Sequence, residues 1–192
     1  MSLLVTSVRG GLKARGRSRG LPTVLMGYAI ECLVEAYVLI GSGGRITTAR
    51  PDSDVDHRDF IVNEMGGYQT IYLQVKGTPS LDRQQVKILI HYPKGKILSD
   101  PRLIFILCLV DAKALMLSHV WVIPSPDLNR LAPRSTLPRN RVELEFQAGI
   151  RGKGKWSRFE IEPAQLGVRL LELIRQQGGR RASQKSRLRN AA

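Results

Sequence analysis

Hydrophobic positions along the first part of the chain predict one long helix ahead of any strand. Thr23 is a candidate N-cap for a helix over residues 24–40, and the glycine-rich segment 41–44 is a candidate stop. Apolar residues cover much of the circumference of this expected helix rather than a single stripe. We therefore expect the helix to be buried against a sheet.

Short runs of β-branched and other apolar residues follow the helix, and each predicts a strand. The run 103–110 is apolar throughout, which is typical of a strand covered on both faces. Gly66 and Gly67 lie between two other runs and predict that these runs form a hairpin. The expected strands are residues 45–49, 59–63, 69–76, 86–92, 103–110 and 115–123, with the hairpin between the second and the third.

The C-terminal part of the chain predicts a late hairpin and a closing helix. Residues 142–146 and 156–161 are expected to pair across a cationic loop. Pro163 suits the first turn of a helix, and Gly178 is expected to end it. The order helix, strands, helix predicts an α/β or α+β domain in which a mixed central β-sheet is flanked by helices. The apolar stripe of the closing helix consists of Leu166, Leu170, Leu171 and Ile174.

Positive charge is concentrated at the two ends of the 192-residue chain, whose formal net charge is +14. Residues 1–20 contain five Lys or Arg and residues 175–192 contain six, and neither segment contains a carboxylate. These eleven charges leave only +3 for residues 21–174. We expect basic flexible arms at residues 1–20 and 178–192 and a domain between them, over residues 21–177.

Such arms favour a polyanionic partner, most simply nucleic acid, because Lys and Arg contact phosphates and displace the counterions that the phosphates hold. The alternative is that the arms only confer solubility or unspecific adhesion. Charge does not indicate what is done to the nucleic acid. The residues expected to contact nucleic acid are Arg15, Arg17, Arg19, Arg180, Arg181 and Lys185.

The sequence indicates a cytoplasmic protein without a membrane partner. No uninterrupted run of about 18 apolar residues is present, and the start of the chain does not resemble a secretory signal. Cys32 and Cys108 lie inside apolar runs and are interpreted as buried, reduced thiols.

The densest group of candidate functional residues lies within residues 51–76. Asp59 begins one expected strand, and Gln74 and Lys76 lie in the next one. Side chains two positions apart in a strand share a face, and the hairpin is expected to bring Asp59 beside Gln74 and Lys76. A carboxylate and a side-chain carbonyl are hard oxygen ligands that suit Mg²⁺ (or Mn²⁺), and a neighbouring lysine can steady an attacking water or stabilise charge on phosphorus.

An aspartate ahead of an apolar strand, a turn, and Gln-x-Lys in the next strand resemble the PD-(D/E)XK nuclease superfamily. Pro51 and Asp52 are a literal Pro-Asp pair, but Asp59 fits the metal-binding position of the superfamily better. The resemblance is to small bacterial members without an assigned role and extends over about residues 24–175, while its motifs are confined to residues 27–76.

This resemblance implies a restriction-endonuclease-like core and a Mg²⁺-dependent endonuclease that hydrolyses phosphodiester bonds in DNA. Many members add a glutamate from a preceding helix; Glu31 is our candidate for it, and Glu35 is the second choice. Asp56 is the candidate helper if a second metal binds. The implied metal ligands are Asp59, Gln74 and Glu31, and Lys76 is the remaining catalytic candidate. A homodimer is compatible with the cutting of both DNA strands.

Gln74 departs from the superfamily pattern, which usually has Asp or Glu at this position. Glutamine can coordinate a metal through its carbonyl group but brings no charge. Some similar families with Gln-x-Lys are active, and others have become binding modules. The alternative function is therefore a catalytically inactive nucleic-acid-binding protein on the same fold.

The aspartates of residues 52–59 have two other interpretations. Asp52, Asp54 and Asp56 match the opening of an EF-hand calcium loop, but His57 and Asn63 stand where that loop needs glycine and glutamate. The aspartates can also simply solvate a loop.

Overall fold

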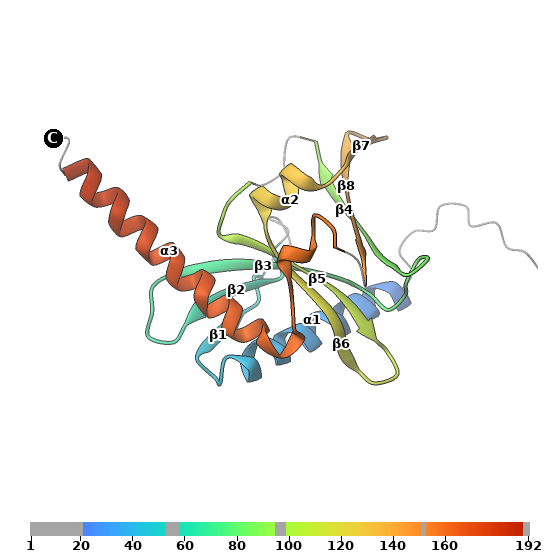
Figure 1. The fold of residues 1–192 in the computed structure, drawn as a ribbon, viewed down its shortest axis with the longest axis horizontal. Helices are drawn as coiled ribbons and strands as arrows, with labels where there is room; N and C mark the ends of the chain where they lie inside the picture. The colour runs from blue at the N-terminus through green and yellow to red at the C-terminus, as the bar shows by residue number, and fades with distance from the viewer. Residues whose placement is uncertain (1–20, 53–57, 95–98, 151–152, 190–192) are drawn as a thin grey trace, which may run out of the picture.

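The computed structural model describes residues 21–52, 58–94, 99–150 and 153–189, which form two β-sheets with helices packed on them (Figure 1). The larger, central sheet has six strands in the order β1-β2-β3-β5-β6-β9. β3 and β5 are parallel, and the other neighbouring strands are antiparallel. The expected α+β architecture with a mixed central sheet is therefore confirmed. The strands are β1 (Ile46–Ala49), β2 (Phe60–Glu64), β3 (Thr70–Thr78), β5 (Leu103–Asp111), β6 (Met116–Pro124) and β9 (Glu160–Ile161).

Two helices, α1 (Leu21–Gly41) and α3 (Leu166–Arg189), pack against one face of the central sheet (Figure 1). The helices approach closely where Gly167 meets the end of α1. A Cβ atom at Gly167 would collide with the backbone of Gly41 and Ser42, so only glycine allows this approach. The helices share one core with the sheet, to which α1 contributes Ile30, Val34 and Val38.

A smaller, three-stranded sheet in the order β4-β8-β7 covers the opposite face of the central sheet (Figure 1). β5 lies between the two cores: Ile104 and Ile106 face the helices, and Phe105 and Leu107 face the second sheet. The expectation that this strand is covered on both faces is confirmed. The remaining elements are β4 (Gln85–Pro93), α2 (Ser125–Leu131), β7 (Arg134–Leu137), β8 (Arg141–Gly149) and the short 3-10 helices η2 (Ser157–Phe159) and η3 (Pro163–Gln165).

The first half of the sequence folds largely as predicted. The helix expected at residues 24–40 lies within α1, and the hairpin is formed by β2 and β3 with Phe60 opposite Leu73. Residues 86–92 form most of β4, and their partner strand is β8 in the second sheet.

The late hairpin is wrong. β8 pairs with β4 and β7, while residues 156–161 hold η2 and the two-residue strand β9, which pairs with β6. Alternating burial in β8 comes from packing against the central sheet, and such alternation does not reveal a partner strand. The stop at Gly178 is wrong as well, because α3 continues to Arg189. A glycine inside a helix costs only about 1 kcal/mol relative to alanine.

Burial of α1 is less extensive than its apolar composition predicts. Residues 23–29 are all exposed, and the buried positions begin at Ile30.

Cys108 is buried, which raises the pKa of its thiol to about 12, but Cys32 is exposed, so the prediction for Cys32 is wrong. The segment Thr23–Gly41, with a mean hydropathy of 1.7, has the length and apolar composition of a membrane-crossing helix. Helices in the core of soluble proteins can have the same length and composition. The absence of a membrane partner therefore remains a prediction.

Candidate functional site

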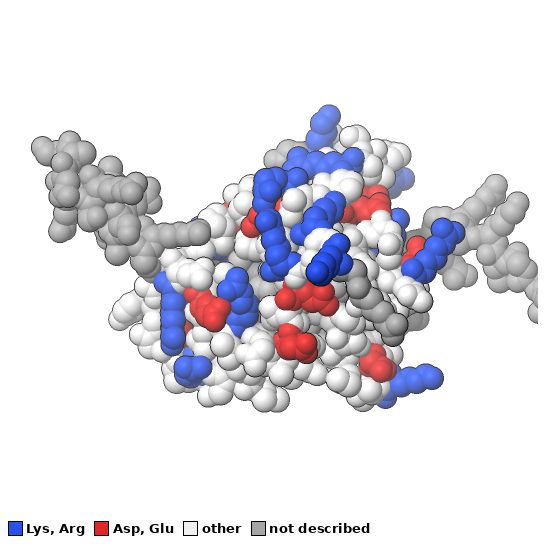
Figure 2. All heavy atoms as spheres, viewed as in Figure 1, with Lys and Arg blue, Asp and Glu red and all other residues white. Residues whose placement is uncertain are grey.

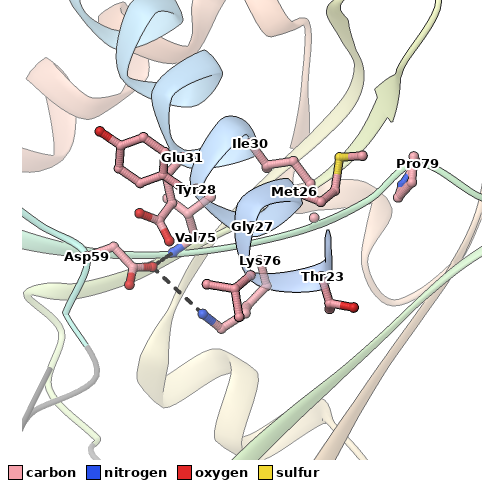
Figure 3. Close-up of a pocket in the computed structure, with 12 residues that line it drawn as sticks. Thr23, Met26, Gly27, Tyr28, Ile30, Glu31, Asp59, Val75, Lys76 and Pro79 are labelled. Carbon is pink, nitrogen blue, oxygen red and sulfur yellow. Dashed lines mark hydrogen bonds and ion pairs between the residues drawn. The ribbon is translucent and has the colours of Figure 1, made fainter. Parts of the chain in front are cut away.

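Asp59 is fixed at the start of β2 by two bonds to the neighbouring strand β3. Its backbone N–H donates to the carbonyl oxygen of Leu73 at 2.8 Å, which continues the β2–β3 ladder by one residue. Its carboxylate Oδ2 accepts a hydrogen bond from the backbone N–H of Val75 at 2.6 Å. The Nζ atom of Lys76 lies 3.9 Å from the same oxygen. The hairpin thus brings Asp59 and Lys76 together, as the sequence predicts (Figure 3).

Gln74 lies on the opposite face of β3 from the helices, and Leu73 and Val75 point into the helix-covered core. The Gln74 side chain is buried, with 4% exposure, and its Oε1 atom accepts a hydrogen bond from the Tyr92 hydroxyl at 3.0 Å. Tyr92 belongs to β4 and reaches Gln74 from the second sheet. Burial, and secondarily the charge of Asp59, raise the pKa of Tyr92, so its hydroxyl stays protonated as a donor.

Glu31 on α1 is paired with Arg50, which follows β1. The Arg50 guanidinium lies 2.9 Å from a carboxylate oxygen of Glu31 and 3.2 Å from one of Glu35. It also stacks over the rings of Phe60 and Tyr28, at 4.5 Å and 5.1 Å from their centroids. Arg50 therefore explains how the apolar helix tolerates two acidic residues.

The pKa of Glu31 is raised from its ordinary value. Burial is the largest cause, and the negative charge of Asp59 acts in the same direction. Arg50 and Lys76 oppose the shift. The negative charge of Asp59 is thus the second cause of the raised pKa of Glu31, and a bound cation would act against it.

A cavity of about 730 Å³ opens between the first turns of α1 and the end of β3 (Figure 3). Its polar residues include Glu31, Asp59 and Lys76. Gln74 is only two residues from Lys76 in the sequence but does not line the cavity. The remaining wall is apolar and is formed mostly by α1, including Val24, Met26, Tyr28 and Ile30.

The chemistry of these residues fits a divalent cation with few protein ligands. Two carboxylates, Glu31 and Asp59, meet at one cavity, and Mg²⁺ typically keeps several waters and shares phosphate oxygens beside one or two carboxylates. Gln74, whose carbonyl oxygen accepts a hydrogen bond from Tyr92, is not part of this cavity lining. Among the described residues, no three His, Cys, Asp or Glu side chains form a metal-binding group, so a site closed by protein ligands alone is not present there.

The other predicted residues have different positions. Glu35 is held by Arg50 and by the hydroxyl of Thr48, at 2.7 Å, outside the cavity lining. Asn63 lies in β2 rather than in a loop, which removes the last position of the EF-hand interpretation. Asp56 and the arm residues Arg15, Arg17 and Arg19 lie outside the residues that the structure describes. For Arg180, Arg181 and Lys185 only the helical backbone is described.

Tyr92 and Arg50 contact the candidate site residues but were missed by sequence reasoning. Tyr92 comes from another sheet, so no local pattern connects it to Gln74. Its only signal is general, since a buried tyrosine hydroxyl usually finds a hydrogen-bond partner. A cation such as Arg50 could have been expected from the sequence. Glu31 and Glu35 lie one turn apart on an apolar helix, and their negative charges require a cation nearby.

Comparison with known proteins gives no relative for this chain. No family model, no curated protein and no solved structure matches it.

Proposed function

We propose that the chain is a metal-dependent nuclease that hydrolyses phosphodiester bonds in DNA. The observation that carries this proposal is the meeting of Glu31, Asp59 and Lys76 at one cavity, with Lys76 Nζ 3.9 Å from Asp59 Oδ2. The sequence resemblance to PD-(D/E)XK nucleases supports it, and a restriction-endonuclease-like core is part of the proposal.

Glu31 and Asp59 would hold a Mg²⁺ ion (or Mn²⁺), whereas Gln74 lies outside the cavity lining. A bound divalent cation supplies Lewis acidity and makes hydroxide available near neutral pH. Hydrolysis joins the oxygen of water to phosphorus and breaks one bond from phosphorus to a sugar oxygen, which leaves with a proton. Lys76 can orient the water or offset the negative charge that develops on the phosphate.

The basic ends of the chain would supply affinity for the DNA backbone. Residues 21–174 carry a net charge of only +3. On the face drawn in Figure 2, Lys and Arg side chains gather over α2 and the second sheet, with Asp and Glu side chains among them. Part of this charge is neutralised locally, since Arg130 and Arg158 both bond Asp127. The arms, which contain no carboxylate, are therefore the stronger source of phosphate contacts.

Replacement of Lys76 tests the proposal. Lys76→Ala should lower the cleavage rate by about 100-fold or more while the affinity for DNA changes little, because Lys76 acts on the transition state and is one cation among many. Lys87→Ala is the matched control, since Lys87 is paired with Glu145 on the second sheet. Cleavage that survives Lys76→Ala would refute the assignment.

A second candidate function, catalytically inactive nucleic-acid binding, is favoured by the position of Gln74. Gln74 is neutral, buried, bonded to Tyr92 and outside the cavity lining. This function predicts salt-sensitive DNA binding and no cleavage in Mg²⁺ or Mn²⁺. Gln74→Glu restores the usual acidic residue of the motif. A gain of cleavage in that variant alone would indicate a degenerate site, whereas cleavage by the unaltered chain would exclude this alternative.

A further inference from the structure

The apolar wall of the cavity has no role in the proposed hydrolysis. Val24, Met26 and Tyr28 line it from the first turns of α1, and their exposed fractions are 56%, 43% and 57%. These side chains therefore face solvent beside the charged residues Asp59 and Lys76. Exposing apolar side chains to water is unfavourable, and a cluster of them beside polar groups is typical of a binding site.

We infer that this wall holds an unpaired nucleobase next to the phosphate at Lys76, so that the substrate is single-stranded DNA or a strand separated from its partner. The inference rests on the proposed function, because it takes the nucleic acid to lie in this cavity. In a duplex both faces of each base are covered by neighbouring bases, and the phosphates form the outer surface. An unpaired base can offer a flat apolar face to Val24 and Met26, whereas a base inside a duplex cannot.

The size of the cavity is compatible with this occupant. A volume of about 730 Å³ lies within the range of pockets that enclose small organic groups. The cavity lining combines Lys76 and two carboxylates with apolar side chains of α1. A nucleotide combines the same two chemistries, since its phosphate is charged and its base has apolar faces.

The charge pattern of the surrounding sequence also favours a single strand. Residues 21–30 contain no charged side chain, and Arg17 and Arg19 precede them directly in the sequence. Proteins that bind single strands combine cations that contact the backbone with surfaces on which bases stack. The chain thus joins an apolar wall to a cationic segment without an intervening acid.

Two other occupants of the wall are less well matched to the cavity. A lipid surface or the apolar helix of a second copy would cover Asp59 and Glu31 and remove them from water. Burying carboxylates against hydrocarbon is costly. A nucleotide with a divalent cation would instead compensate their charge.

The closing experiment measures equilibrium binding by fluorescence anisotropy, with Ca²⁺ in place of Mg²⁺. The probes are a labelled single-stranded oligonucleotide, the same strand with abasic positions, and the corresponding duplex. The double variant Val24→Ala/Met26→Ala removes part of the wall and keeps the helix, because alanine favours it. Leu25→Ala is the matched control, since Leu25 is 58% exposed on the same turn but does not line the cavity.

The unaltered chain should bind the normal strand about tenfold more tightly than the abasic strand, as expected for one stacked base. Val24→Ala/Met26→Ala should lower that ratio, and Leu25→Ala should keep it. Duplex affinity should be the same for all three proteins. This comparison isolates the contact between wall and base, because the phosphates are common to both strands.

Equal affinity for normal and abasic strands, or an unchanged ratio in Val24→Ala/Met26→Ala, would overturn the inference. A dimer that becomes a monomer in Val24→Ala/Met26→Ala would also overturn it, because the wall would then bind a second copy of the chain. Binding to anionic vesicles that is lost in both Val24→Ala/Met26→Ala and Leu25→Ala would overturn it in favour of a lipid surface. The readout is independent of hydrolysis. If the chain prefers the normal strand to the abasic strand but does not cleave DNA in Mg²⁺, only the nuclease function is refuted. If it cleaves DNA without this preference, only the contact with the base is refuted.

Discussion

The two halves of α1 lie in different environments, although the sequence is apolar in both. Residues 23–29 are exposed at every position. In the second half, Ile30, Val34 and Val38 form a stripe with exposed fractions of 4%, 0% and 1%. The second half also carries Glu31 and Glu35, which Arg50 holds against the sheet.

This comparison shows that a continuous apolar helix can serve two purposes. In the second half the apolar side chains stabilise the fold, because their surface is removed from water. In the first half they contribute little to the core, and Val24, Met26 and Tyr28 line the candidate site. Substitutions should therefore change stability in the second half and ligand binding in the first.

The largest effect on stability is expected where α3 meets the end of α1. Gly167→Ala should lower the free energy of unfolding by about 3 kcal/mol, because the new Cβ would collide with backbone atoms of Gly41 and Ser42 and force the helices apart. Gly154→Ala is the control, since a Cβ there meets no atom within 4 Å. Equal denaturation midpoints for the two variants would contradict the close packing of this half.

A pair of substitutions within α1 tests the difference between its halves directly. Val34→Ala should lower the free energy of unfolding by about 2 kcal/mol, since it removes fully buried apolar surface. Leu25→Ala should change it by less than about 0.5 kcal/mol, because Leu25 is 58% exposed. Chemical denaturation measures both. Comparable losses would show that the first half of α1 is packed too.

The Arg50 pairing should have a smaller effect. Arg50→Gln leaves Glu31 and Glu35 without their common cation, and we expect a loss of about 1 kcal/mol, since all three side chains are partly exposed. Arg169→Gln breaks an exposed pair with Glu172 on one helix and should be nearly neutral. Thermal unfolding that does not separate these variants would argue against a structural role for Arg50.

The smallest expected effect is the pH dependence contributed by Glu31. Its pKa is raised from the ordinary value of 4.5, mainly by burial and secondarily by Asp59, so the folded chain binds this proton more tightly than the unfolded chain. The contribution to stability is fully present below the ordinary value and is lost as the pH rises through the raised pKa. Unfolding measured over a series of pH values should show this fall, and Glu31→Gln should flatten it. An unchanged slope in Glu31→Gln would assign the fall to other groups.

The parts of the fold that could be predicted are those set by neighbouring residues. The β2–β3 hairpin follows from two apolar runs and the turn at Gly66, and it places Asp59 beside Lys76. The burial of β5 on both faces follows from its uninterrupted apolar run. Each of these features depends on residues close together in the chain.

The second sheet could not be predicted in the same way. β4 and β8 lie far apart in the sequence, and Ile88 of β4 is opposite Phe146 of β8. Their alternation indicates strands but no partner, so the late hairpin was assigned to the wrong segment. The same limit hid Tyr92, which meets Gln74 only because the second sheet lies against the first.

The most direct test of the central claim is incubation of the purified chain with supercoiled plasmid and with circular single-stranded DNA in Mg²⁺ or Mn²⁺. Asp59→Ala should abolish cleavage, because it removes the carboxylate beside Lys76. Asp127→Ala should leave cleavage unchanged, since Asp127 lies in α2, outside the cavity lining. The account predicts metal-dependent cleavage in the unaltered chain and in Asp127→Ala alone. No cleavage of either DNA, or equal cleavage by Asp59→Ala, would contradict it.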